Sequence, residues 1–175
     1  MEKKAINLKE ASFTQAINIS AQWCKEWGED LLSEEVLADR IAELIKTKNG
    51  LRGFFVYTLS DRDCCLLDKL PISLVFKLIE SGKDVVEIVT NNLIMSSAQI
   101  VFHQREGNHE YKLISENISE RCKGILSVLE TKLVTKTINE IIKDLDNQGN
   151  SLDNSTKYDD QQKEFIIKQI FDIAQ

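Results

Sequence analysis

The stretch DVVEIVTNNLIMSSAQIVFHQR, residues 84–105, decides the fold. Plotted at 100° per residue, its main apolar stripe consists of Val85, Val86, Val89, Leu93 and Ile100. Two further stripes follow, one of Ile88, Met95 and Phe102 and one of Ile94 and Val101. A helix that is apolar on several sides is normally buried between neighbouring elements. The stretch therefore predicts a buried central helix.

The same stretch allows a second interpretation. Residues 85–90 are rich in β-branched side chains, Asn91-Asn92 can form a turn, and Gly107-Asn108 separates two further apolar runs. These features predict a small antiparallel meander at about 84–114 and an α+β fold. We favour the helix because the alternation of apolar and polar residues is not sustained over the second half. Residues 54–60 are open between helix and strand in the same way.

The remaining sequence predicts more helices, in keeping with only one proline and seven glycines. Asn7 with Glu10 is a capping box for a helix that ends near Gly28. Ser33 caps a second helix, for which Asn49-Gly50 provides the stop. Pro71 and Gly82 bracket a short helix.

Beyond the central stretch, the pattern predicts one long helix or two in tandem. Asn117 with Glu120 provides a capping box, and the apolar spacing changes phase near Thr131. The fold class predicted is mainly α, a compact bundle of five or six helices around residues 84–105. Residues 1–146 are expected to form a single domain.

The C-terminal end differs in composition from the rest. Residues 147–159 are polar and predict a linker, and residues 160–175 predict an amphipathic helix. A helix this short is marginal alone in water, so its apolar face must find a surface. We expect that surface on the parent domain, on a second copy in a homodimer, or on a different protein. The expected interaction residues are Phe165, Ile166, Ile170 and Phe171.

Charge and composition limit the classes of partner that the chain can bind. The net charge of −6 argues against nonspecific nucleic-acid binding and against an anionic membrane surface. Five polar residues interrupt the central stretch too often for a bilayer span, namely Glu87, Asn91, Asn92, Gln99 and Arg105. The N-terminus lacks a signal peptide's apolar core, which favours the cytoplasm. The four cysteines are then expected to be free thiols.

The sequence holds few chemical motifs. It has no phosphate-binding glycine loop and no zinc pattern, so we expect neither a cofactor nor a metal. His103, Asp61 and Cys65 are weak catalytic candidates. An imidazole oriented by a carboxylate could transfer a proton, and a thiolate could serve a metal, a covalent cofactor or redox chemistry. For each of them we favour a structural role.

The function expected from these features is that of a cytoplasmic helical module for protein interaction or regulation, without enzymatic activity. The acidic C-terminal end, with a net charge of −4 over residues 144–175, would help to select the partner. The alternative is an enzyme or a small-ligand-binding protein. Its pocket would lie between residues 54–65 and 99–109.

Overall fold

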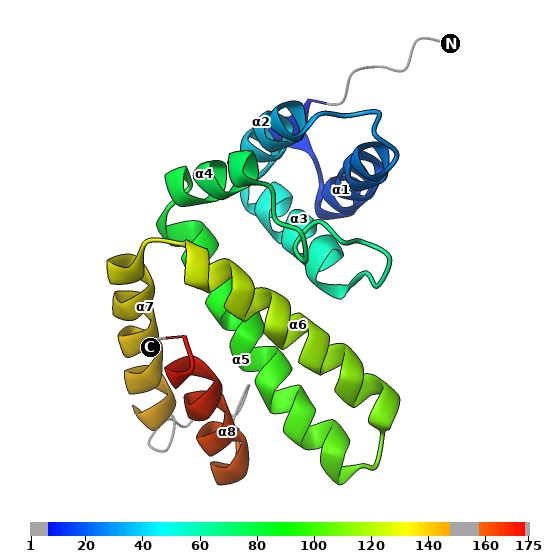
Figure 1. The fold of residues 1–175 in the computed structure, drawn as a ribbon. Coiled ribbons are helices and arrows are strands. Elements are labelled where there is room, and N and C mark those ends of the chain that lie inside the picture. Colours follow the sequence, from blue (N-terminus) through cyan, green and yellow to red (C-terminus); the bar gives the residue numbers. More distant parts are fainter. Residues whose placement is uncertain (1–6, 148–157, 174–175) are drawn as a thin grey trace. The chain divides into compact units, whose positions relative to one another are not determined.

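The structure is a computed structural model that describes residues 7–147 and 158–173, with side chains described up to Lys143 in the first range. Every regular element in these ranges is a helix (Figure 1). After a short 3-10 helix, η1 (Leu8–Glu10), the α-helices are α1 (Phe13–Gly28), α2 (Glu34–Leu44), α3 (Lys48–Ser60), α4 (Ile72–Glu80), α5 (Lys83–Arg105), α6 (His109–Val128), α7 (Thr131–Asn147) and α8 (Asp160–Phe171). The mainly-α prediction is confirmed. The alternative meander at 84–114 is wrong, because two helices occupy that region.

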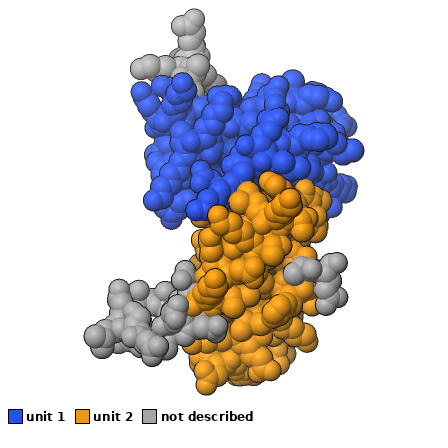
Figure 2. Space-filling view, turned by 90° about the vertical axis from the view of Figure 1, so that its left-hand side faces the viewer, with its two compact units in different colours: residues 1–85 blue, residues 86–175 orange. Residues whose placement is uncertain are grey.

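The chain divides into two compact units, unit 1 (residues 1–85) and unit 2 (residues 86–175) (Figure 2). The single domain expected over residues 1–146 stays a prediction. The boundary falls in the first turn of α5, where no change in composition marks it. Helix α8 belongs to the same unit as most of α5, α6 and α7.

Unit 1 is built around the close approach of α1 and α3. Gly53 of α3 lies so near α1 that a Cβ added to it would stand 2.5 Å from the Cβ of Ala16. Phe54 and Phe55 follow in the same helix and are fully buried. Residues 54–60, open between helix and strand in the sequence, therefore belong to a core helix. Helix α4 packs on α2 and buries Leu74 and Leu78.

Two helix boundaries in unit 1 differ from the predictions. Asn7 caps η1, and α1 begins later with a capping box between Ser12 and Gln15. Asn49-Gly50 does not stop α2, which ends at Leu44, but lies in the first turn of α3. The backbone N–H of Gly50 donates to the side chain of Thr47, the N-cap residue of α3.

Helix α5 confirms the predicted central helix. The main stripe and the stripe of Ile94 and Val101 are buried. The second stripe is not, because Met95 is 57% exposed and Phe102 47% exposed. By length and composition α5 could also cross a membrane, and 61% of its most apolar window is buried. That degree of burial is what the core helix of a globular unit shows.

Helices α6 and α7 follow the tandem arrangement with a break near Thr131. The start of α6 differs from the prediction. Asn108 is the N-cap residue, and its side chain accepts the backbone N–H of Tyr111, whereas Asn117 lies inside the helix. Gly107, with φ of 67°, allows the turn between α5 and α6. Of the expected linker at 147–159, residues 148–157 lie outside the described residues.

Helix α8 begins at a capping box in which the Asp159 carboxylate accepts the Gln162 backbone N–H. Its apolar residues Ile166 and Ile170 are 0% and 1% exposed, so they belong to the core of unit 2. The expected C-terminal helix is thus present, and its apolar face is covered by its own unit.

Candidate functional site

Unit 1 contains a cavity of about 620 Å³ that thiol groups line. One wall is the second half of α1, including Cys24 and Trp27. The other is the end of α3 with the segment that follows it, which provides Tyr57, Asp61, Asp63, Cys64 and Cys65. Small-molecule sites commonly have volumes of about 300–1,000 Å³. The cavity is therefore large enough for a small ligand.

Asp61 gives the segment after α3 its shape. Its Oδ1 accepts the backbone N–H groups of Asp63 and Cys64, both at 2.9 Å. This turn, made by a side chain that mimics a backbone carbonyl, reverses the chain directly after the helix. A second turn, in which the Cys65 carbonyl accepts the Lys69 N–H at 3.0 Å, closes the segment. The two turns hold the adjacent cysteines at the cavity.

Cys24 and Cys64 both line the cavity. Their thiols share a hydrogen bond, and both side chains are more than nine-tenths buried. The hydrogen bond to Cys64 raises the pKa of Cys24 far above its ordinary value, and burial adds to this increase. Cys24 therefore remains protonated at neutral pH.

The other polar groups of the cavity differ in exposure. Cys65 and Asp61 are half-buried, whereas Asp63 and Lys25 are exposed, so the cavity opens to solvent. Burial, with smaller contributions from nearby acidic groups, raises the pKa of Tyr57 to about 12. Its hydroxyl therefore stays protonated and can donate a hydrogen bond. Among the described residues, no group of three or more His, Cys, Asp or Glu side chains could hold a metal ion.

The structure brings two of the three predicted catalytic candidates together. Asp61 and Cys65 both line the cavity, but His103 belongs to α5 in unit 2. There His103 stacks on Tyr111, with ring centroids 5.5 Å apart, and meets the edge of Phe102 at 5.3 Å. The thiol-lined cavity has α1 as its second wall, and no residue of 99–109 lines it. The pocket expected between 54–65 and 99–109 stays a prediction.

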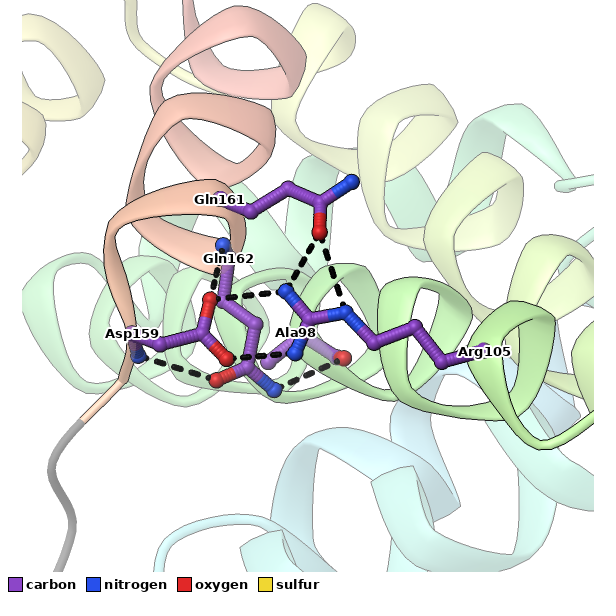
Figure 3. A network of polar contacts seen from close by, with 5 residues as sticks. All are labelled: Ala98, Arg105, Asp159, Gln161 and Gln162. Atoms are coloured by element: carbon purple, nitrogen blue, oxygen red, sulfur yellow. Dashed lines mark hydrogen bonds and ion pairs between the residues drawn. The ribbon is translucent and has the colours of Figure 1, made fainter.

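A polar cluster in unit 2 fastens the start of α8 to α5 (Figure 3). The Arg105 guanidinium donates to both carboxylate oxygens of Asp159, at 2.5 and 2.9 Å, and to the side chain of Gln161. The side chain of Gln162 donates to the Ala98 carbonyl at 3.2 Å. Arg105 holds the pKa of Asp159 well below its usual range, and the Gln162 N–H adds to this effect.

The four expected interaction residues of α8 differ in accessibility. Ile166 and Ile170 are core residues, and Phe165 is half-buried beside a second cavity of about 560 Å³ between α5 and α8. Phe171 is 57% exposed. Only the two phenylalanines can therefore meet a partner while α8 stays docked.

Sequence reasoning missed an exposed apolar face on α4. Ile72, Phe76 and Ile79 are 72%, 61% and 40% exposed. They fall within 60° on a helical wheel, roughly opposite the buried Leu74 and Leu78. The same angular plot that identified the central stretch would have revealed two apolar faces here. Cys24 was missed for another reason, because nothing in its local sequence points to the distant Cys64.

Fold and site define the chain as an all-helical protein with two compact units and a thiol-lined cavity in the first. The family described as "Uncharacterised conserved protein UCP020893" matches residues 12–173, and the chain belongs to this family. No curated protein matches the chain, and no solved structure matches it.

Proposed function

We propose that this protein is a helical interaction module that pairs with a second copy of itself through α4. The observation that carries the proposal is the outward stripe of Ile72, Phe76 and Ile79, hereafter the α4 stripe. A helix with two opposite apolar faces normally has a neighbour on each. In this chain α2 covers one face, and the other remains exposed.

The basic residue of α4 is paired with acidic side chains. Lys77 is the basic residue within α4, and its ammonium group lies 3.0 Å from the Asp39 carboxylate and 3.9 Å from that of Glu80. The shorter of these ion pairs directs the Lys77 ammonium group toward α2, to which Asp39 belongs. Pairing a charge that lies next to an apolar surface lowers the cost of desolvating that surface.

A second copy is the occupant that the spacing favours. Two-fold contacts require a surface that is complementary to itself. If two α4 helices pack antiparallel, Ile72 of each copy lies opposite Ile79 of the other, and the two Phe76 rings meet at the centre. One short helix per copy makes a small interface, so we expect a dissociation constant on the order of micromolar or weaker.

Sedimentation equilibrium tests the proposal with one variant and one matched control. Phe76→Asp places a charge in the centre of the α4 stripe and should weaken dimerisation at least tenfold. Leu113→Asp changes a side chain of similar exposure, 56% against 61%, on α6 and should leave dimerisation unchanged. Both positions are exposed, so both variants should stay folded. Equal effects of the two substitutions would contradict the proposal, as would a wild-type chain that remains a monomer at every concentration.

The cavity of unit 1 favours a second candidate function, the binding of a small ligand. Tyr57 offers a hydroxyl donor, Asp61 a carboxylate and Trp27 an aromatic surface, all on the same cavity. Native mass spectrometry of the purified chain should then show a bound small molecule. Ala21→Phe, which fills the cavity from α1, should abolish it. A mass equal to that of the 20.0 kDa chain alone would contradict this candidate.

A further inference from the structure

We propose that Cys24 and Cys64 are a site of reversible oxidation, at which a hydroperoxide entering the cavity converts the two thiols into an intramolecular disulfide. The inference does not depend on pairing through α4. It rests on the hydrogen-bonded thiol pair, on the cavity that both residues line and on the turn that holds Cys64 in place.

The structure selects this pair among the four free cysteines. Adjacent Cys64 and Cys65 cannot bridge easily, because neighbouring Cα atoms are about 3.8 Å apart and disulfides usually need about 4.4–6.8 Å. Cys122 is fully buried in α6 of unit 2, and burial raises its pKa to about 12. Unlike the other three cysteines, Cys122 is not among the residues that line the cavity. Cys24 and Cys64 already share a hydrogen bond.

The hydrogen bond assigns different roles to the two sulfur atoms. Cys24 retains its proton, because the hydrogen bond to Cys64 and burial raise its pKa far above the ordinary value. Cys64 is therefore the nucleophile, and Cys24 is the group that resolves the intermediate. The cavity opens to solvent beside them, so a molecule as small as hydrogen peroxide can reach the pair.

The reaction balances in two steps. The Cys64 sulfur attacks one oxygen of the hydroperoxide ROOH, the O–O bond breaks, and the Cys64 thiol proton leaves with the departing oxygen as ROH, which gives a sulfenic acid on Cys64. The Cys24 sulfur then attacks the sulfenic sulfur, the S–O bond breaks, and water leaves with the Cys24 proton. Two electrons pass from the two thiols to the peroxide, and one S–S bond forms.

Peptide mapping after hydrogen peroxide treatment tests the inference on the full-length native chain. Alkylation, digestion and mass spectrometry should show a linked Cys24–Cys64 peptide pair. The number of titratable thiols should fall from four to two, and a dithiol reductant should restore all four. A linked pair that includes Cys65 or Cys122, a disulfide between chains, or four thiols after treatment would overturn the inference.

Two variants separate the paired thiols from their neighbour. Cys65→Ser alters a half-buried thiol on the same cavity and should still lose two thiols to peroxide. Cys64→Ser should form no linked pair and should lose its thiols at least tenfold more slowly. Loss of the disulfide in Cys65→Ser would assign the reaction to Cys65 instead. If Cys64→Ser does not fold, the wild-type peptide map alone decides the outcome.

Discussion

At the scale of single residues, two glycines determine how closely the elements of unit 1 approach. A Cβ at Gly53 would stand 2.5 Å from the Ala16 Cβ and 3.0 Å from the Ile17 nitrogen. A Cβ at Gly50 would stand 1.8 Å from the Leu44 carbonyl oxygen. Neither glycine has a positive φ. Both positions therefore require glycine because a larger side chain would clash with the neighbouring backbone or side chain. The contact of α1 with α3 therefore depends on a missing side chain.

Gly53→Ala should destabilise the chain by about 1–3 kcal/mol, the usual cost of overpacking a core. Gly124→Ala is the matched control, because nothing lies within 4 Å of a Cβ built at that helical position. It should stabilise α6 by about 0.5–1 kcal/mol through helix propensity. Urea unfolding of both variants measures the two effects. A Gly53→Ala chain as stable as the wild type would contradict the close contact of α1 with α3.

Residue-level reasoning from the sequence found part of the thiol cavity. Asp61 and Cys65 could be selected because their side chains are reactive and lie close together in sequence. His103 was grouped with them on the same chemical grounds, but it belongs to another unit, where it stacks on an aromatic ring. Cys24 lies far from Cys64 in sequence and meets it only through the packing of α1 beside the end of α3. Such a pair follows from tertiary structure.

At the scale of elements, the periodicity of residues 84–105 was the most informative signal. It correctly predicted a long helix with a buried main stripe, in which Leu93 is 0% exposed. Helix ends were harder to predict, because several residues near each end are able to cap. Asn7 and Asn117 each have a glutamate three residues later, which is the spacing of a capping box. The α-helices are nevertheless capped by Ser12 and Asn108. The actual cap is set by where the helix can pack.

Leu93→Ala tests whether α5 is a core element. The substitution removes a fully buried side chain and should cost about 2–5 kcal/mol. Met95→Ala, in the same helix but 57% exposed, should cost much less. Chemical denaturation of the two variants measures the difference. A loss below about 1 kcal/mol for Leu93→Ala, the scale of surface substitutions, would contradict the assignment of α5 to the core.

The attachment of α8 should depend on pH through Asp159. Arg105 lowers the pKa of this carboxyl in the folded state, so the ion pair contributes stability above the unfolded pKa of about 4. That contribution should disappear as the pH falls from about 4 through the lowered folded pKa. NMR titration should show the lowered pKa in the wild-type chain and a higher one in Arg105→Gln.

Lys168→Gln is the control for this titration, since it removes a positive charge from α8 without touching the ion pair. It should leave the pKa of Asp159 near its wild-type value. High salt should reduce the difference between wild type and Arg105→Gln, because both partners of the pair are about half exposed. The same pKa in wild type and Arg105→Gln would show that the pair does not form in solution.

At the scale of the whole molecule, the sequence predicted the helical class but not the division into two units. A linker of distinct composition marks many domain boundaries, and residues 147–159 were assigned as one for that reason. The boundary found after Val85 lies inside α5, and only Ser81 and Gly82 separate this helix from α4. A continuous helix gives no compositional signal. The outward face of α4 was overlooked because the helix was predicted from Pro71 and Gly82 at its ends, and its apolar residues were not plotted by angle.

The central claim is that two copies of the chain meet through antiparallel α4 helices, and crosslinking tests it most directly. In a Cys65→Ser background, Ile72→Cys and Ile79→Cys chains are prepared separately and treated with a short bismaleimide, alone and as a mixture. The mixture should give several-fold more crosslinked dimer than either chain alone, because the two positions lie opposite one another between copies. Dimer yields no higher in the mixture than in the Cys65→Ser chain itself would contradict the claim.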